Sequence, residues 1–265
     1  MCWMRWTDAA CGGVRDPSSR WPMRYAILSD VHANLDALDA VLEDVAREGV
    51  ERIVCLGDFV GYGPEPNECV ERLRPLVHFA LVGNHDLAAV GRLDPNRFNL
   101  YARIAIEWTR QHLSPSTRAY LESLPARTEA EGVLFVHASP RDPVEEYILD
   151  PVTADDNFRY EPFQICFFGH SHLPVWFVHD GQRTELRCLP YRTPVRLEGE
   201  LRHLVNVGSV GQPRDGDPRA AYVVYDAAQR TAELRRVPYP VERVQRKMQA
   251  AELPKPLWLR LGEGR

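Results

Sequence analysis

Five apolar runs in this chain each end in polar residues of the types that bind metal ions. The runs are YAILS, RIVCLG, FALVG, VLFV and ICFFG, and the polar residues that follow them are Asp30, His32, Asp58, Asn84, His85, His137, His170 and His172. Short continuous apolar runs are typical of strands buried on both faces. In open parallel sheets, the loops beyond the carboxyl ends of the strands converge and form the binding pocket. We therefore expect these eight side chains to meet in one pocket.

The first half of the chain alternates between strand and helix patterns. A strand at RYAILS precedes a helix that Asn34 is placed to cap and Gly49 to end. The next expected elements are a strand at Arg52–Leu56, a helix around Glu68–Arg74, a strand at Val77–Val82, a helical pair at about 98–124 and a strand at Val133–Val136. This alternation favours a parallel sheet with right-handed crossovers.

The second half of the chain changes character. A polar, proline-rich loop from Ser139 to Pro162 is long for a plain connection, which predicts a wall or lid of the site. A hairpin about Asp180-Gly181 and three closely spaced strands, HLVNVGS, AAYVVYD and TAELRRV, predict mostly antiparallel pairing. The expected fold class is α/β, a four-layer αββα sandwich in which two mixed β-sheets pack face to face with helices outside.

We expect three segments along the chain. Residues 1–22 form an N-terminal extension that is disordered or belongs to a misassigned start, because Met23 directly precedes the first strand. Residues 23–240 form one domain with a helical insertion at about 98–124. Residues 241–265 form a tail with one amphipathic helix and a proline-punctuated end.

Charge, hydrophobicity and cysteine usage exclude several classes of protein. The 265 residues carry a formal net charge of −5, which provides no basic field for nucleic acid. No apolar run approaches the length that spans a bilayer. The six cysteines form no CxxC pair and fit a reducing compartment. We expect a cytoplasmic protein with no membrane partner and no strong signal for nucleic-acid binding, and the oligomeric state stays open.

The ligand types indicate two divalent ions. Imidazoles and carboxylates without thiolates suit Mn²⁺, our first expectation, and also Fe, Zn²⁺, Co²⁺ and Ni²⁺. The candidate ligands are more than one ion needs. Two ions that share a bridging carboxylate account better for their number. Asp30 and Asp58 offset only part of the metal charge, so the pocket stays cationic and suits a phosphate ester. Bridging the ions also lowers the pKa of a shared water toward about 7, which makes hydroxide available.

The polar ends of the runs fall into five ordered blocks, SDVH, LGDFVGYG, GNHD, VHASP and GHSH. The ordered set resembles the calcineurin-like metallophosphoesterases. It is closer to their small bacterial and archaeal phosphodiesterase branch, which includes proteins named as diadenosine tetraphosphatase-like. The resemblance implies a dinuclear enzyme that hydrolyses phosphodiesters or small phosphomonoesters, nucleotides among them, with a metal-bridging hydroxide.

The resemblance also implies a role for each residue of the blocks. The implied ligands are Asp30, His32 and His172 for one metal, Asn84, His137 and His170 for the other, and Asp58 as the bridge. The division of His170 and His172 between the two metals stays open. His85 matches the family's non-ligand histidine, which stabilises the transition state or protonates the leaving oxygen.

Four further residues are expected to contact the substrate, namely Asn34, Gly208, Ser209 and Arg214. Backbone N–H groups around Gly208 and Ser209 would cradle a phosphate, and Arg214 would pair with a second phosphate or a leaving group. A glycine-rich turn with a solvated arginine explains the segment around Arg214 equally well.

Two other functions remain open. A binding scaffold can have the same fold, although a scaffold has no need of the full ligand set and His85. A protein serine/threonine phosphatase is the other alternative. Such phosphatases carry an Asp-Arg pair where this chain has Gly61 and Tyr62, and a glutamate where it has Asp86.

Overall fold

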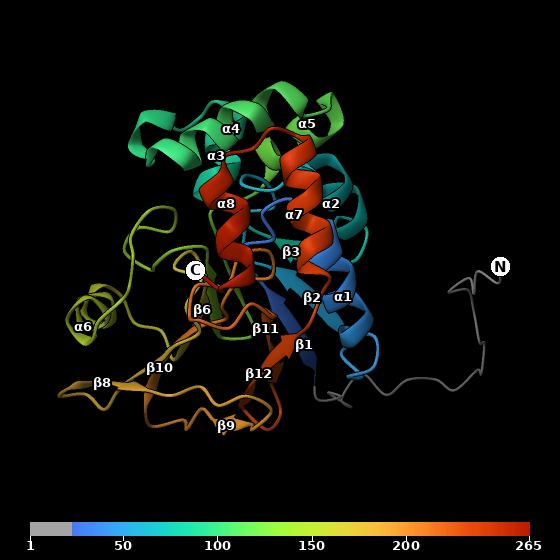
Figure 1. Cartoon of the computed structure of the whole chain (residues 1–265). Helices are drawn as coiled ribbons and strands as arrows, with labels where there is room; N and C mark the ends of the chain where they lie inside the picture. Colours follow the sequence, from blue (N-terminus) through green and yellow to red (C-terminus); the bar gives the residue numbers. More distant parts are fainter. Residues whose placement is uncertain (1–22) are drawn as a thin grey trace, which may run out of the picture.

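Two mixed β-sheets of six strands each form the centre of the molecule (Figure 1). The computed structural model describes residues 23–265, and the predicted extension at 1–22 lies outside the described residues. In spatial order, the first sheet consists of β3 (Val77–Ala80), β2 (Arg52–Cys55), β1 (Arg24–Leu28), β11 (Ala220–Asp226), β12 (Thr231–Val237) and β9 (Val195–Arg196). The second consists of β4 (Arg127–Ala130), β5 (Val133–Val136), β6 (Ile165–Phe168), β10 (Arg202–Asn206), β7 (Trp176–His179) and β8 (Thr184–Arg187).

Each sheet combines a parallel part with antiparallel strands. In the first sheet, β1, β2 and β3 are parallel, and β11 pairs antiparallel with β1. In the second, β5, β6 and β10 are parallel, while β4 and β7 pair antiparallel at either side of them. The strands that precede the five sequence blocks are therefore the parallel ones, and their carboxyl ends carry the candidate residues.

The helices complete a sandwich of four layers. They are α1 (Leu35–Val45), α2 (Pro66–Leu73), α3 (Asn84–Val90), α4 (Leu100–His112), α5 (Pro115–Ser123), α6 (Pro151–Tyr160), α7 (Val241–Ala250) and α8 (Lys255–Leu259), with 3₁₀ turns η1 (Pro95–Arg97) and η2 (Arg260–Gly262). Between the sheets, Ile27 of β1 belongs to the same buried cluster as Phe135 and Phe167 of the second sheet. Leu38 of α1 packs on the outer face of the first sheet, and Phe158 of α6 on that of the second. The predicted fold class is confirmed.

Three helices were absent from the prediction. The GNHD block opens α3, which ends at Gly91 in the left-handed region with φ 87°. The predicted loop from Ser139 to Pro162 contains α6, because Asp150 accepts hydrogen bonds from two N–H groups of the first turn and Pro151 occupies the first helical position. The tail has a second helix, α8, so the expectation of one helix there was wrong. The short strand β4 was also missed.

The tail packs against the insertion rather than extending away from the domain. Val244 and Met248 of α7 and Leu257 of α8 are buried in one cluster with Tyr62 and Ala105. Figure 1 shows α7 and α8, coloured red, in front of the sheets and below α4 and α5, with the C-terminus near the middle of the view. The end of the chain is therefore placed near the loops that follow the strands.

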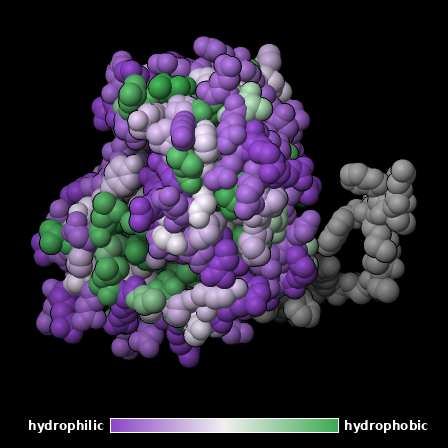
Figure 2. All heavy atoms as spheres, in the orientation of Figure 1, coloured by the Kyte–Doolittle hydropathy of each residue, from purple (hydrophilic) through white to green (hydrophobic). Residues whose placement is uncertain are grey.

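One face of the described part is mixed in polarity (Figure 2). Figure 2 shows a mainly hydrophilic face with scattered hydrophobic patches, one of them over α4 at the top of the view. Within residues 23–265, every helix is too short or too polar to cross a bilayer.

Candidate metal centre

The structure brings all eight predicted residues together and buries them. They come from the loops after β1, β2, β5 and β6 and from the first turn of α3, which follows β3. None of the eight is more than 7% exposed. Burial of so many polar groups is costly unless they are paired or bind a ligand. Their concentration at one edge of both sheets marks it as the candidate site.

The backbone is bent into the left-handed region at most of these positions. The residues concerned, with their φ angles, are Asp30 (55°), His32 (50°), Asp58 (54°), His170 (63°) and His172 (62°). Non-glycine residues rarely adopt this conformation, and clusters of them occur at functional sites. Hydrogen bonds hold the bends, because Asp30 N donates to Gly57 O at 3.0 Å and His32 N to Asp58 O at 2.9 Å.

Backbone carbonyls fix the orientation of three imidazoles. Nδ1 of His32 lies 3.1 Å from Val60 O, Nδ1 of His172 lies 2.6 Å from Gln212 O, and Nδ1 of His137 lies 3.1 Å from Leu56 O. A carbonyl oxygen only accepts hydrogen bonds, so each Nδ1 carries the proton. Each Nε2 therefore presents a lone pair to the centre, the arrangement typical of metal-binding histidines.

The lone pairs face one another at short distances. Nε2 of His32 and Nε2 of His172 are 3.0 Å apart, and neither has a proton to share. Oδ1 of Asp30 lies 3.3 Å from the same His172 nitrogen and is buried without a hydrogen-bond partner. Such an arrangement is repulsive unless a cation lies among the atoms. The donor set thus fits divalent metal ions.

The candidate residues form three overlapping groups. Within each group, the ligand atoms all lie within 4.8 Å of one another. The groups are Asp30 with His32 and His172, Asp30 with Asp58 and His137, and His32 with Asp58 and His85. The first group contains the three ligands expected for one metal. Near the second, His137 Nε2 lies 3.2 Å from Asn84 Oδ1 and 3.5 Å from Asp58 Oδ2.

The protonation states also suit cations. Burial lowers the pKa of His170 to about 3 and that of His172 to about 4, so both rings are neutral at pH 7. Burial raises the pKa of Asp58 well above its usual range, and the charges of Asp86 and Asp30 raise it further. Burial also opposes ionisation of Asp30, yet the adjacent His172 lowers the pKa of this carboxyl overall. Crowded carboxylates of this kind are stabilised by bound cations.

His85 is placed differently from the other imidazoles. Its ring lies against Tyr62, with centroids 4.4 Å apart, and against Phe98 at 4.9 Å. Its Nδ1 is buried without a hydrogen-bond partner. Its backbone N–H donates to Asp58 Oδ1 at 2.9 Å, which ties the first turn of α3 to the loop after β2. The ring is therefore oriented by packing and by the position of the α3 backbone.

Three of the four residues predicted to contact the substrate have polar groups that form hydrogen bonds within the protein. Asn34 Oδ1 accepts from Ala37 N at 3.1 Å, as expected of a helix cap, and Asn34 Nδ2 donates to Gly211 O at 2.9 Å. Ser209 Oγ donates to Asp30 O at 2.9 Å. Gly208 N donates to the Asn206 side chain at 2.9 Å, so this N–H is not free for a phosphate. Ser209 thereby helps to position the Asp30 loop.

The fourth predicted contact, Arg214, has free donor groups near the site. Its side chain is partly exposed, and its NH2 group donates to Tyr62 Oη at 3.2 Å. Sequence reasoning missed Tyr147, whose ring centroid is 4.0 Å from that of His170, and Glu145, whose carbonyl lies 3.1 Å from His170 Nε2. Both lie in the predicted lid segment, which therefore does contribute a wall to the site.

Comparisons with known proteins agree with this geometry. The family profile described as calcineurin-like phosphoesterase superfamily domain matches residues 23–230. An uncharacterized protein of Methanocaldococcus jannaschii, MJ0912, is 40% identical over 245 residues, which cover 91% of this chain and 98% of that protein. Phosphodiesterase YfcE of Escherichia coli is 27% identical over 214 residues, which cover 77% of this chain and 88% of YfcE.

A solved structure extends the agreement to three dimensions. The crystal structure of a metallophosphoesterase from Sphaerobacter thermophilus matches with a TM-score of 0.83 at 41% identity, covering 92% of this chain and 100% of that one. The family match spans all five sequence blocks and every residue of the buried cluster. This chain belongs to the calcineurin-like phosphoesterase superfamily and is a metallophosphoesterase, a hydrolase of phosphoesters.

Proposed function

We propose that this metallophosphoesterase works with two divalent ions, Mn²⁺ being the first candidate, and hydrolyses phosphodiesters or small phosphomonoesters. The observation that carries the proposal is the 3.0 Å approach of two unprotonated imidazole nitrogens, on His32 and His172, beside an unpartnered oxygen of Asp30. A second group, Asp58 with His137 and Asn84, lies next to it and supports a second ion.

The proposed ligands are the ones that the sequence resemblance implies, and five of the seven lie in the groups of ligand atoms described above. They are Asp30, His32 and His172 for one ion, Asn84, His137 and His170 for the other, and Asp58 between them. When bound, such ions lower the pKa of a water molecule and stabilise the charge that develops on phosphoryl oxygens.

His85 is the proposed catalytic residue that is not a ligand. Burial lowers the pKa of its ring well below the usual value, and the positive charge of Arg214 lowers it further, so the ring is neutral at pH 7. A neutral imidazole carries one N–H, which can donate to a phosphoryl or leaving oxygen of the substrate. Packing against Tyr62 and Phe98 holds the ring in place for this role.

The test compares the substitutions Asp58→Asn and His85→Ala with the unaltered protein. Hydrolysis of bis-p-nitrophenyl phosphate is measured with Mn²⁺ present, and bound metal is measured by elemental analysis. We expect turnover to fall about 10²- to 10⁴-fold in both variants. Asp58→Asn is expected to lose bound metal as well, whereas His85→Ala keeps it.

The matched control is His112→Ala, which removes an exposed histidine that stacks on Trp108 far from the cluster in sequence. Its turnover should equal that of the unaltered protein. Undiminished hydrolysis in both site variants would refute the proposal. A large preference for phosphopeptides over diesters would favour the protein phosphatase alternative instead.

A further inference from the structure

Two arginines from distant parts of the chain meet at one aromatic ring beside the metal centre. Arg214 lies in the loop after β10, and Arg260 lies in η2, near the C-terminus. The Cζ atoms of Arg260 and Arg214 are 4.8 Å and 5.7 Å from the centroid of the Tyr62 ring. The same ring packs against His85 and, at 4.6 Å between centroids, against His32.

Neither guanidinium has an anionic partner. Within residues 23–265, no carboxylate oxygen lies within 4.0 Å of a side-chain nitrogen of Arg214 or Arg260. Instead, both donate to one neutral atom, Gln212 Oε1, at 3.0 Å and 2.6 Å. The Nε atoms of both arginines are buried without a hydrogen-bond partner.

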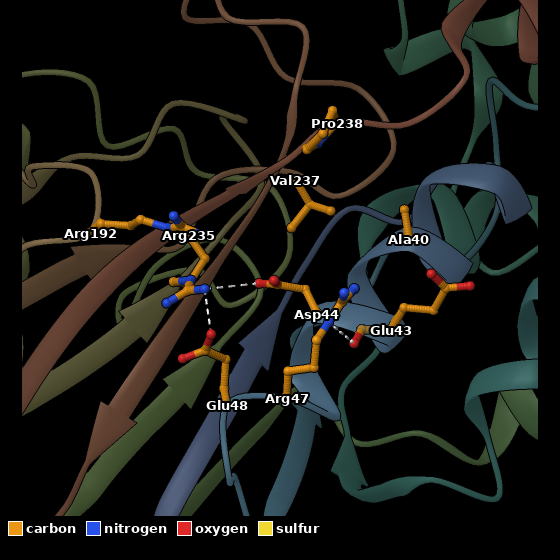
Figure 3. Close-up of a pocket in the computed structure, with 9 residues that line it drawn as sticks. All are labelled: Ala40, Glu43, Asp44, Arg47, Glu48, Arg192, Arg235, Val237 and Pro238. Atoms are coloured by element: carbon orange, nitrogen blue, oxygen red, sulfur yellow. Dashed lines mark hydrogen bonds and ion pairs between the residues drawn. The ribbon is translucent and has the colours of Figure 1, made fainter.

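The two arginines of the described residues that are buried, Arg235 and Arg236, are both neutralised. Figure 3 shows Arg235 directed at Asp44 and Glu48, with dashed lines marking both contacts, and a third carboxylate, Glu233, lies 3.0 Å away. Asp215, which directly follows Arg214 in the sequence, pairs with Arg236 instead. The missing partner of Arg214 is thus not explained by a local shortage of acidic residues.

Two adjacent, partly buried cations destabilise the fold unless an anion joins them. Burial lowers the pKa of Arg260, and the charge of Arg214 lowers it further. Stacking on Tyr62 offsets part of this cost by cation–π attraction, but it does nothing about the repulsion between the two charges. Paired guanidinium groups with unused N–H donors are the arrangement that binds phosphate oxygens.

We propose that Arg260 and Arg214 form a second anion subsite beside the metal centre, which binds a phosphate adjacent to the one that is hydrolysed. The preferred substrates are then esters of diphosphate or longer polyphosphates rather than isolated diesters. This inference rests on the proposed function, because it takes the metal centre as the place of hydrolysis. It assigns the C-terminal segment a role in substrate selection.

The experiment uses AMP and ADP, which differ by one phosphate, as competitors of bis-p-nitrophenyl phosphate hydrolysis at a fixed concentration of free Mn²⁺. In the unaltered protein, ADP should bind about tenfold more tightly than AMP. In Arg260→Gln this difference should shrink to about twofold or less, through weaker binding of ADP. The control is Arg265→Gln, which removes an exposed arginine five residues further along and should leave the ratio unchanged.

Two further measurements keep the outcomes distinct. Calorimetric titration measures ADP binding to the unaltered protein and to Arg260→Gln directly, so it tests the subsite even if the diester is not hydrolysed. The melting temperature of Arg260→Gln should equal or exceed that of the unaltered protein, because the substitution removes one of two repelling charges. If the ratio of the ADP affinity to the AMP affinity is unchanged in Arg260→Gln, the subsite alone is overturned. If the unaltered, metal-loaded protein does not hydrolyse the diester, the proposed function is overturned.

Discussion

Gly61 shows how closely single residues are fitted around the catalytic candidates. It has φ 88°, and a Cβ atom at this position would lie 2.5 Å from His85 Nδ1. Protein phosphatases of the superfamily carry an aspartate where Gly61 stands. In this chain, the space that such a side chain would need is taken by the His85 ring. The glycine and the packing of His85 on Tyr62 are therefore parts of one arrangement.

Gly61→Ala is predicted to displace His85 without removing metal. We expect turnover of bis-p-nitrophenyl phosphate to fall about 10²-fold, since a misplaced general acid loses most of its effect. Elemental analysis should show unchanged metal content. Gly132→Ala is the control, because Gly132 also has positive φ (75°) but meets nothing within 4 Å. Equal losses of activity in both variants would show that backbone strain alone is responsible.

The identity of the candidate ligands was predictable from the sequence, whereas their orientation was not. Aspartates and histidines after buried strands are visible as local patterns, and Asp30 with His32 illustrates this. The carbonyls of Val60 and Gln212, which fix the tautomers of His32 and His172, could not be foreseen. Any residue has a carbonyl, so only the folded arrangement shows which one lies opposite an imidazole. Arg260 was missed for the same reason, since nothing near it in sequence belongs to the site.

At the scale of elements, helices with apolar periodicity were predictable and short polar ones were not. The spacing of Leu38, Val41 and Leu42 identified α1, and all three are buried. The helix α6 has a start signal, with Asp150 as its cap and Pro151 as its first residue, but the polar composition of the segment predicted a loop. The helix α3 has seven residues and begins within a conspicuous polar block, so tertiary contacts rather than periodicity define it.

The pairing of β7 with β10 contains a histidine that should make stability depend on pH. His203 is fully buried, accepts from Trp176 Nε1 at its Nδ1 (3.1 Å), and donates from Nε2 to Glu198 O (3.0 Å). These bonds require the neutral ring, and burial lowers the pKa of His203 below its usual value. The unfolded chain, with a histidine pKa of about 6.5, therefore takes up the proton first as pH falls.

The contribution of His203 is thus complete above pH 6.5 or so and is lost as pH falls toward the folded-state pKa. The contribution of His203 to the free energy of unfolding should fall by up to about 1.4 kcal/mol for each unit by which the pH falls in this range. We expect the difference in unfolding free energy between the unaltered protein and His203→Phe to shrink between pH 7.5 and 5.5, as measured by urea titration. Other histidines titrate in both proteins and cancel in the difference. A difference that stays constant or grows would contradict the assignment.

For the whole molecule, the existence of two packed sheets was predictable, but the order of their strands was not. Alternating elements indicated the parallel part, and the Asp180-Gly181 turn indicated the hairpin of β7 and β8. The pairing of β1 with β11 joins residues about two hundred positions apart, such as Ile27 and Val223. Local patterns contain no information on such pairings, which depend on how both sheets close over the shared core.

Metal removal should destabilise the entire domain, because the centre joins loops from both sheets. We predict that chelation lowers the melting temperature by roughly 5–10 °C, which corresponds to about 2.7 kcal/mol for an ion at a hundredfold excess over its dissociation constant. Added Mn²⁺ should restore it, as followed by differential scanning fluorimetry. Ca²⁺ should restore far less, since it disfavours imidazole ligands. A melting temperature insensitive to both treatments would be incompatible with the proposed centre.

The left-handed backbone at Asp30, Asp58 and His170 limits which side chains these loops can accept. Aspartate and histidine are among the few residues that tolerate such dihedral angles, so geometry and chemistry select the same residue types there. Anyone who grafts this constellation onto another scaffold would have to transplant the bent loops along with it. A β-branched residue at these positions would not replace the metal ligand, and its side chain would also disfavour the left-handed backbone conformation.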